Sequence, residues 1–256
     1  MTDATGTDGQ ARRSDGPLLA VVTGASRGIG AGIAAAASAA GAELAVCNRS
    51  PSAFDRQLTV DLAEPSSWPE FGSWFDAVVS EVAPSRIVAV HNAATLTPIG
   101  FAGEIDAAGY ATNVLLNSAA PQVIGDAVIR TAQRTSTPTV LVQLSSGAGK
   151  SPYPGWTSYC ASKAAVDMWV RSVGLEQAER GNWVRTLSIS PGVVATDMQA
   201  EIRSSEADAF PNVERFRGLH DEGRLADPAE VGATIWKIAC DGRWENGTVG
   251  DLSLAD

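Results

Sequence analysis

Short apolar runs alternate with longer, helix-like runs along almost the whole chain. The apolar runs have the length and the glycine or polar boundaries of buried strands, and they lie at 18–24, 42–48, 57–62, 86–94, 139–146, 183–192 and 247–254. The runs between them predict helices at 29–40, 68–82, 106–134, 157–180 and 227–240. Strands separated by crossover helices predict an α/β fold: a doubly wound, Rossmann-type domain with a parallel sheet of about seven strands and helices on both faces.

The length of the chain fits one domain of this kind. With 256 residues, 45% of them hydrophobic, and no repeat or linker, we expect a single domain over 17–256. A loop-rich segment at 193–227 is expected to form a lid over the substrate. Residues 1–16 are polar and contain no apolar run, which predicts a disordered tail and not a signal peptide.

Charge and cysteine content exclude several classes of function. The net charge of −10 argues against nucleic acid or an anionic membrane as a partner, and no apolar run is long enough for a membrane helix. Cys47, Cys160 and Cys240 are widely spaced and lack the spacing of metal ligands. We therefore expect a reduced, cytoplasmic protein without a metal site.

The segment TGASRGIG, at 23–30, lies between the first predicted strand and the first predicted helix. Gly24, Gly28 and Gly30 omit side chains where the backbone must turn and approach a diphosphate, and the N–H groups at the helix start favour an anion. A tight turn without a ligand would also use glycine. The strand–turn–helix context favours a dinucleotide site.

The second predicted strand ends in Asn48 and Arg49, with no acidic residue. In dinucleotide sites an acid at this place binds the 2′-hydroxyl of the adenosine ribose, whereas arginine accommodates a 2′-phosphate. Together with Arg27 in the glycine-rich segment, Arg49 favours NADP(H) over NAD(H). The alternative is that both arginines are solvent-facing charges.

Tyr159 precedes Lys163 by about one helical turn, so the two side chains share a face. A nearby cation favours the phenolate of a tyrosine, whose usual pKa is about 10, and this suits a group that protonates a carbonyl oxygen as a hydride reaches its carbon. Ser146, at the end of a strand, is placed to steady that oxygen. Asn113 lies inside a helix, where asparagine is unfavourable, and would hold a bent turn or a water near the lysine. The alternatives are a surface tyrosine beside a lysine stem, a turn-forming serine and a satisfied interior amide.

These motifs together resemble the short-chain dehydrogenase/reductase family from about Leu18 to the C-terminus. The residues that carry the resemblance are TGASRGIG, Asp61-Leu62, Asn92-Ala93-Ala94, Asn113, Ser146, Tyr159-x-x-x-Lys163 and Pro191-Gly192 followed by Thr196. The resemblance implies the strand order 3-2-1-4-5-6-7.

The resemblance also implies a role for each residue. Tyr159 would be the general acid, and Lys163 would bind the nicotinamide ribose and lower the tyrosine pKa. Ser146 would hold the substrate carbonyl, and Asn113 would anchor a proton-relay water. Asp61 would bind the adenine, Asn92 would brace the sheet, and Thr196 with the backbone after Pro191-Gly192 would fix the carboxamide. The full cofactor set comprises Gly24, Ser26, Arg27, Gly28, Ile29, Gly30, Asn48, Arg49, Asp61, Leu62, Asn92, Ala93, Tyr159, Lys163, Pro191, Gly192, Val194 and Thr196.

A narrower resemblance, to sepiapterin reductases and related benzil reductases, is carried by GWTSYCASKAAVDM, SPGVVATDMQ and FRGLHDEGRLADP. It implies NADPH-dependent reduction of vicinal dicarbonyls or related ketones. Two features depart from the family. His91 and Ala94 flank Asn92-Ala93 where the family usually has asparagine and glycine, and we interpret His91 as a packing residue. Only residues 49–60 separate the second strand from Asp61, so the helix usual at this place is expected to be absent or reduced to a turn.

On the substrate side, Tyr153, Trp156 and Met198, with Phe210 and Phe216, either wall an apolar pocket or pack the lid onto the body. The sequence thus predicts an NADPH-dependent carbonyl reductase acting on a small ketone or α-diketone. The alternatives are an NAD-dependent secondary-alcohol dehydrogenase or 3-oxoacyl reductase, and a non-catalytic nucleotide-binding regulatory protein. The family resemblance further implies a homodimer or homotetramer formed through the helices near 106–134 and 157–180.

Overall fold

The computed structural model describes residues 16–181 and 183–252. Within these residues one parallel sheet has the strand order β3-β2-β1-β4-β5-β6-β7, which confirms the predicted topology. The predicted disordered tail falls, apart from Gly16, outside the described residues. The strands are β1 (Leu18–Thr23), β2 (Glu43–Asn48), β3 (Gln57–Thr59), β4 (Arg86–His91), β5 (Thr139–Leu144), β6 (Val184–Ser190) and β7 (Thr248–Asp251).

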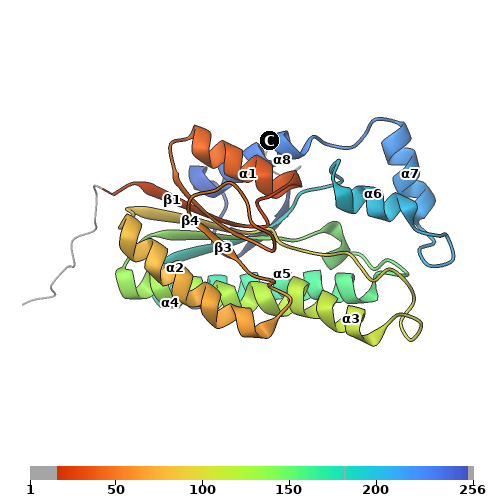
Figure 1. Cartoon of the computed structure of the whole chain (residues 1–256), viewed down its shortest axis with the longest axis horizontal. Coiled ribbons are helices and arrows are strands. Elements are labelled where there is room, and N and C mark those ends of the chain that lie inside the picture. The colour runs from red at the N-terminus through yellow and green to blue at the C-terminus, as the bar shows by residue number, and fades with distance from the viewer. Residues whose placement is uncertain (1–15, 182, 253–256) are drawn as a thin grey trace, which may run out of the picture.

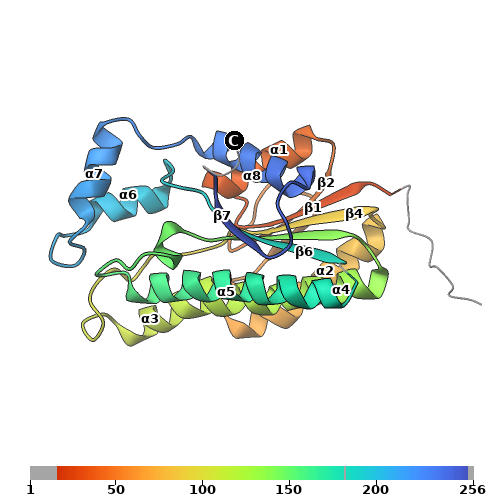
Figure 2. The same ribbon diagram turned by 180° about the vertical axis from the view of Figure 1, so that it is seen from behind.

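Helices cover both faces of this sheet (Figures 1 and 2). Helices α1 and α8 lie on one face, whereas α2, α4 and α5 lie on the other, and α6 and α7 stand beyond the carboxyl ends of the strands. The α-helices are α1 (Gly28–Ala39), α2 (Trp68–Val82), α3 (Ala107–Val114), α4 (Ala120–Thr135), α5 (Thr157–Glu179), α6 (Asp197–Ser204), α7 (Val213–Asp221) and α8 (Pro228–Asp241). Three short turns of other helix types are η1 (Pro65–Ser67), η2 (Leu115–Ala119) and η3 (Gly147–Gly149).

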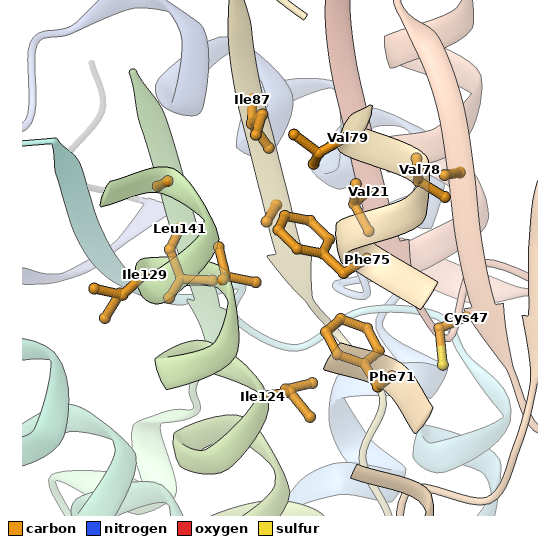
Figure 3. Packing of buried hydrophobic residues seen from close by; sticks show 14 of the residues in the cluster. Val21, Cys47, Phe71, Phe75, Val78, Val79, Ile87, Ile124, Ile129 and Leu141 are labelled. Carbon is orange, nitrogen blue, oxygen red and sulfur yellow. The ribbon is translucent and has the colours of Figure 1, made fainter. Parts of the chain in front are cut away.

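Alternate side chains of each central strand enter different cores. In β1, Leu19 and Val21 face α2 and α4, whereas Ala20 and Val22 face α1 and α8. Figure 3 shows the first core, where Phe71 and Phe75 of α2 pack between strand residues and Ile124 of α4. Both faces of the sheet are thus buried, which explains the continuous apolar runs of the sequence.

Two predicted segments differ from the structure. The stretch 193–227, expected to be rich in loops, contains α6 and α7. Helix α6 is capped by Thr196, whose side chain accepts a hydrogen bond from the Gln199 N–H. A prediction based on the apolar pattern alone does not detect such a polar cap. The helix predicted over 106–134 is divided by the π-helical turn η2.

The edge of the sheet at β3 is short. The strand spans three residues and not the six predicted, because its pairing with β2 ends at Asn48 and the chain then turns at Asp61, whose Oδ1 accepts from the Ala63 N–H. Residues 49–56 contain no helix, as the short spacing predicted. Strand β7 is also shorter than the predicted 247–254, of which residues 253 and 254 lie outside the described residues. No helix in the described part of the chain has the length and apolar character needed to cross a membrane.

Candidate active site

The glycine-rich loop between β1 and α1 is pressed against the end of β4. A Cβ atom at Gly30 would lie 2.1 Å from the carbonyl oxygen of Gly24, so no side chain fits there. Asn92, directly after β4, donates from Nδ2 to the carbonyl oxygens of Gly24 (2.8 Å) and Thr23 (3.2 Å). Asn92 therefore braces the loop, and Ala93 lies beside it because its N–H donates to Thr23 Oγ1.

The start of helix α1 fits the diphosphate of a dinucleotide. Arg27 is the N-cap residue in an extended conformation, no side chain caps the first turn, and this turn contains no acidic residue. Uncapped N–H groups and the positive end of the helix dipole favour an anion. Ser26, Gly28 and Ile29 belong to the same turn into the helix.

Asn48 holds the loop from the side of β2. Its Oδ1 accepts from the Ala25 N–H at 2.8 Å, and its Nδ2 donates to Ser52 Oγ at 3.2 Å. Both polar atoms of this buried side chain have protein partners. Asn48 therefore shapes the loop, and the cofactor contact predicted for it stays a prediction.

The two arginines predicted to mark a 2′-phosphate site differ in their surroundings. Arg49 follows β2 and is exposed. Arg27 Nη1 lies 2.5 Å from Oδ2 of Asp197 at the start of α6, and both side chains are 71% exposed. An exposed ion pair of this kind contributes little to stability, so the Arg27 guanidinium can exchange it for another anion.

The remaining cofactor residues lie along the carboxyl edge of the sheet. Asp61 is partly exposed after β3, whereas Leu62 is buried in the core beside α2. Pro191 and Gly192 follow β6, and Val194 forms a bridge with Ala226 that anchors the beginning of the lid. Thr196 lies against the glycine-rich loop, because a Cβ atom at Gly28 would be 3.3 Å from its Cγ2.

Tyr159, Ser146 and Lys163 meet where β5 ends. Ser146 follows β5 and caps η3, accepting a hydrogen bond from the Ala148 N–H at 3.2 Å. Tyr159 stands in the first turn of α5, and Ser146 is close enough to its phenol to act on the pKa of this group. Lys163 donates from Nζ to the carbonyl oxygen of Leu144 at 2.8 Å, and Nζ is 5.7 Å from the centroid of the Tyr159 ring. The structure thus brings together the three residues for which the sequence predicts acid–base chemistry.

Burial dominates the ionisation of this cluster. It raises the pKa of Tyr159 to about 12, with the Ser146 hydrogen bond acting in the opposite direction. It lowers the pKa of Lys163 to about 8, with the charge of Asp167 acting in the opposite direction. With the protein's own groups alone, the pKa of Tyr159 is raised and not lowered as expected. Burial removes more of the solvation of the phenolate than the neighbouring groups replace.

Asn113 and Asn117 together fasten the loop at 95–97 to the widened turn η2. Asn113 donates from Nδ2 to the carbonyl oxygen of Thr97 at 2.9 Å, and its Oδ1 accepts from Asn117 Nδ2 at 3.0 Å. Asn117 also bonds both the N–H and the carbonyl oxygen of Thr95. The Asn113 amide is thus satisfied within the protein, one of the two alternatives the sequence left open. Asn117 was missed, although a second asparagine one turn later was a visible signal.

His91 is buried at the end of β4. Its Nδ1 lies 3.3 Å from Thr23 Oγ1, and burial, helped by the charge of Lys163, lowers its pKa to about 3. A neutral buried imidazole agrees with the interpretation of His91 as a packing residue. The described residues contain no group of three or more His, Cys, Asp or Glu side chains able to hold a metal ion.

The aromatic residues of the substrate side fasten the lid. Trp156 stacks on Phe210 with ring centroids 4.3 Å apart and presents its edge to Tyr159 at 5.9 Å. Trp156, Phe210 and Phe216 are buried, whereas Tyr153 and Met198 are only partly covered. The sequence left two roles open for these residues. Trp156, Phe210 and Phe216 pack the lid onto the body, whereas for Tyr153 and Met198 a role in the wall of a pocket stays a prediction.

Comparison with known proteins places this arrangement in a family. The model of the short chain dehydrogenase family matches residues 18–207. The chain belongs to the short-chain dehydrogenase family.

Relatives within this family cover nearly the whole chain. A benzil reductase ((S)-benzoin forming) from Bacillus subtilis is 34% identical over 238 residues, which are 91% of this chain and 98% of that protein. Mouse (Mus musculus) sepiapterin reductase is 30% identical over 234 residues, 83% of this chain and 87% of its own. A solved 3-oxoacyl-[acyl-carrier protein] reductase from Brucella melitensis, in complex with NAD, has a TM-score of 0.77 at 24% identity and covers 93% of this chain and 95% of its own. As a short-chain dehydrogenase, the chain is an oxidoreductase.

Proposed function

We propose that this short-chain dehydrogenase is an NADPH-dependent carbonyl reductase that transfers a hydride to a ketone or an α-diketone. The observation that carries the proposal is the cluster at the end of β5, where Ser146 acts on the buried phenol of Tyr159 and Lys163 lies one turn further along α5. Similarity to a benzil reductase supports the α-diketone class, because benzil is an α-diketone.

The protein groups that would hold the cofactor lie around the glycine-rich loop. We assign the diphosphate to the N-terminus of α1 and the adenine to Asp61 and Leu62. The 2′-phosphate is assigned to Arg27 and Arg49, since no acidic residue at the end of β2 is present to bind a ribose 2′-hydroxyl. Lys163 would bind the nicotinamide ribose, and the backbone after Pro191 would hold the carboxamide.

The chemistry of the site is a balanced transfer of one hydride and one proton. When bound, NADPH supplies the hydride and becomes NADP⁺. The carbonyl carbon accepts this hydride, the π-electron pair moves to the carbonyl oxygen, and this oxygen takes the proton of the Tyr159 hydroxyl. The Ser146 hydroxyl donates to the same oxygen and stabilises the charge that develops there. The Lys163 ammonium then favours the phenolate left on Tyr159.

The experiment that tests this proposal is oxidation of NADPH and of NADH, followed at the nicotinamide absorbance, with aldehydes, monoketones, benzil and a sepiapterin-like pterin. We expect NADPH to be preferred and an α-diketone or the pterin to be reduced. Preference for NAD with a secondary alcohol would support the dehydrogenase alternative. Tight NADPH binding without turnover of any carbonyl would support the non-catalytic alternative.

We also infer that the protein forms a homo-oligomer through α4 and α5. Large apolar side chains are exposed on these neighbouring helices: Val123 on α4, and Met168 (58% exposed) and Leu175 (73% exposed) on α5. Exposed apolar surface of this kind often marks an interface. Light scattering after gel filtration should give the mass of a dimer or tetramer for the wild type and of a monomer for Leu175→Glu. A monomeric wild type would contradict this inference.

A further inference from the structure

Asp167 is a buried carboxylate that the cluster of Tyr159, Ser146 and Lys163 leaves unexplained. It follows Lys163 by four residues on α5, and the two side chains are 3% and 4% exposed. Across residues 16–181 and 183–252, they are the only lysine, arginine, aspartate or glutamate side chains that are buried. Burying a charge is costly unless an opposite charge or several hydrogen bonds compensate it. Residues four apart share one helix face, so each is placed to compensate the other.

The carboxylate of Asp167 is held between β6 and η3. Its Oδ1 accepts a hydrogen bond from Ser188 Oγ of β6 at 2.6 Å. Its Oδ2 has no hydrogen-bond partner among the described residues and lies 2.9 Å from the position of a Cβ atom at Gly149. One oxygen is therefore fixed by the sheet, and the charge of the carboxylate is not compensated by a hydrogen bond or ion pair at the other.

The other groups around the Lys163 ammonium carry no negative charge. From β5 it has the carbonyl oxygen of Leu144, and from its own helix the ring of Tyr159. From β4 it faces His91, which is neutral because burial lowers its pKa to about 3. The charge of Asp167 raises the pKa of Lys163 against the effect of burial.

We propose that Asp167 is a positioning residue whose buried carboxylate keeps the Lys163 ammonium charged at the end of β5. This inference rests on the function proposed above, in which a charged Lys163 stabilises the Tyr159 phenolate. The ammonium is the protonated form, so it is present below its pKa and lost as pH rises through it. Without Asp167, this loss should begin at a lower pH.

The direct test is a titration of Lys163 by NMR, which needs no substrate. The chain contains three lysines, Lys150, Lys163 and Lys237, so ¹³C-lysine labelling gives few signals, and Lys150→Arg and Lys237→Arg assign them. In Asp167→Asn, which keeps the size of the side chain and an acceptor for Ser188, we expect the Lys163 titration midpoint to fall by about one pH unit or more. The matched control, Ser188→Ala, removes the hydrogen bond but keeps the charge and should leave the midpoint close to that of the wild type. An unchanged midpoint in Asp167→Asn, or an equal shift in Ser188→Ala, would overturn the proposal.

Kinetics give a second readout. The alkaline limb of the kcat profile should move to lower pH in Asp167→Asn, with rates at low pH close to those of the wild type. A decrease of equal size at every pH would mean a merely structural role and would overturn the proposal. If no carbonyl is reduced but the NMR midpoint shifts as expected, the proposed function fails and the assignment of Asp167 as countercharge stands.

Stability measurements keep the proposal testable if Asp167→Asn folds poorly. Lys163→Met alone leaves the carboxylate without its countercharge, whereas Lys163→Met/Asp167→Asn removes both charges. We expect the double variant to have a higher midpoint of thermal unfolding than either single variant, because neither buried charge is then left alone. Additive losses would show that the two charges are uncoupled and would overturn the proposal.

Discussion

The cofactor side and the lid side of the candidate site are built on different principles. On the cofactor side, short hydrogen bonds among backbone groups and buried amides fix the glycine-rich loop, as where Asn92 Nδ2 meets the Gly24 carbonyl oxygen at 2.8 Å. On the lid side, stacked aromatic rings hold α6 and α7, as where Trp156 stacks on Phe210. Hydrogen bonds fix a single loop shape, whereas aromatic packing tolerates small shifts. We therefore expect changes on the cofactor side to abolish binding and changes on the lid side to alter substrate affinity.

The largest effect on cofactor binding is expected from Gly30→Ala on the cofactor side. Its Cβ atom would lie 2.1 Å from a backbone oxygen, so the loop or the start of α1 must move. We expect NADPH binding to be lost and the free energy of unfolding to fall by about 1–3 kcal/mol or more, as for overpacked sites. Fluorescence titration with NADPH and urea unfolding measure the two effects.

Gly218→Ala in α7 of the lid is the matched control. No atom lies within 4 Å of its Cβ position, and alanine favours a helix by about 1 kcal/mol over glycine. Equal losses of NADPH binding in Gly30→Ala and Gly218→Ala would contradict the claim that NADPH binding depends on the cofactor side and not on the lid.

A smaller effect on cofactor binding, with a large loss of stability, is expected from Phe210→Ala in the lid. The ring is fully buried between Trp156 and Phe216, and its removal should lower the free energy of unfolding by about 3–5 kcal/mol. Because the change is remote from the glycine-rich loop, KM for the carbonyl substrate should rise while the NADPH dissociation constant stays close to that of the wild type. Phe101→Ala, at a partly exposed ring, is the control for loss of a phenylalanine. Equal weakening of NADPH binding and substrate binding by Phe210→Ala would show that the two sides are not separate.

The next effect concerns pH and the polar end of β4. His91 has its pKa lowered to about 3 in the folded protein, so between about pH 6.5 and pH 3 the unfolded chain binds a proton that the folded protein does not. The contribution of His91 to the free energy of unfolding is therefore complete above about pH 6.5. It is lost as pH falls, by about 1.4 kcal/mol per pH unit. His91→Asn should remove this part of the slope, so the difference between the two proteins should change by about 2 kcal/mol between pH 7 and pH 5. Urea unfolding at both pH values measures it; identical slopes would contradict the buried neutral imidazole.

The smallest effect is expected where the two sides touch, at the ion pair of Arg27 and Asp197. Both side chains are largely exposed, so Asp197→Asn should change stability by less than about 1 kcal/mol. If Arg27 contacts the 2′-phosphate, removal of the competing carboxylate should tighten NADPH binding and leave NADH binding unchanged. The gain should shrink at high salt. Equal effects on both cofactors would remove Arg27 from the 2′-phosphate site.

The same contrast explains what the sequence could predict. The glycine-rich loop and the meeting of Ser146, Tyr159 and Lys163 follow from contiguous motifs, whose geometry is set within a few residues or by adjacent strand ends. The sheet order came from the family resemblance that these motifs carry. The lid was expected to be loop-rich because α6 and α7 are short and belong to a hydrophobic cluster with Trp156, which lies far away in the chain. Pairings that join distant segments, such as Asp167 with Ser188 and Arg27 with Asp197, have no local signal.

The pKa of Tyr159 illustrates a second limit. The spacing correctly predicted that Lys163 lies beside Tyr159. The pKa of the tyrosine also depends on how much of the phenol the fold buries, which the spacing does not give. The structure buries both groups, so for Tyr159 desolvation raises the pKa by more than Ser146 lowers it.

The most direct test of the proposed reductase is the rate of hydride transfer from saturating NADPH to benzil in the wild type and in Tyr159→Phe. The phenylalanine keeps the ring that packs against Trp156 and removes only the hydroxyl that would protonate the substrate oxygen. We predict a decrease of about 10²–10⁴-fold, as for loss of a general acid, with NADPH affinity close to that of the wild type. A Tyr159→Phe variant that reduces benzil at nearly the wild-type rate would contradict the assignment of Tyr159 as the proton donor.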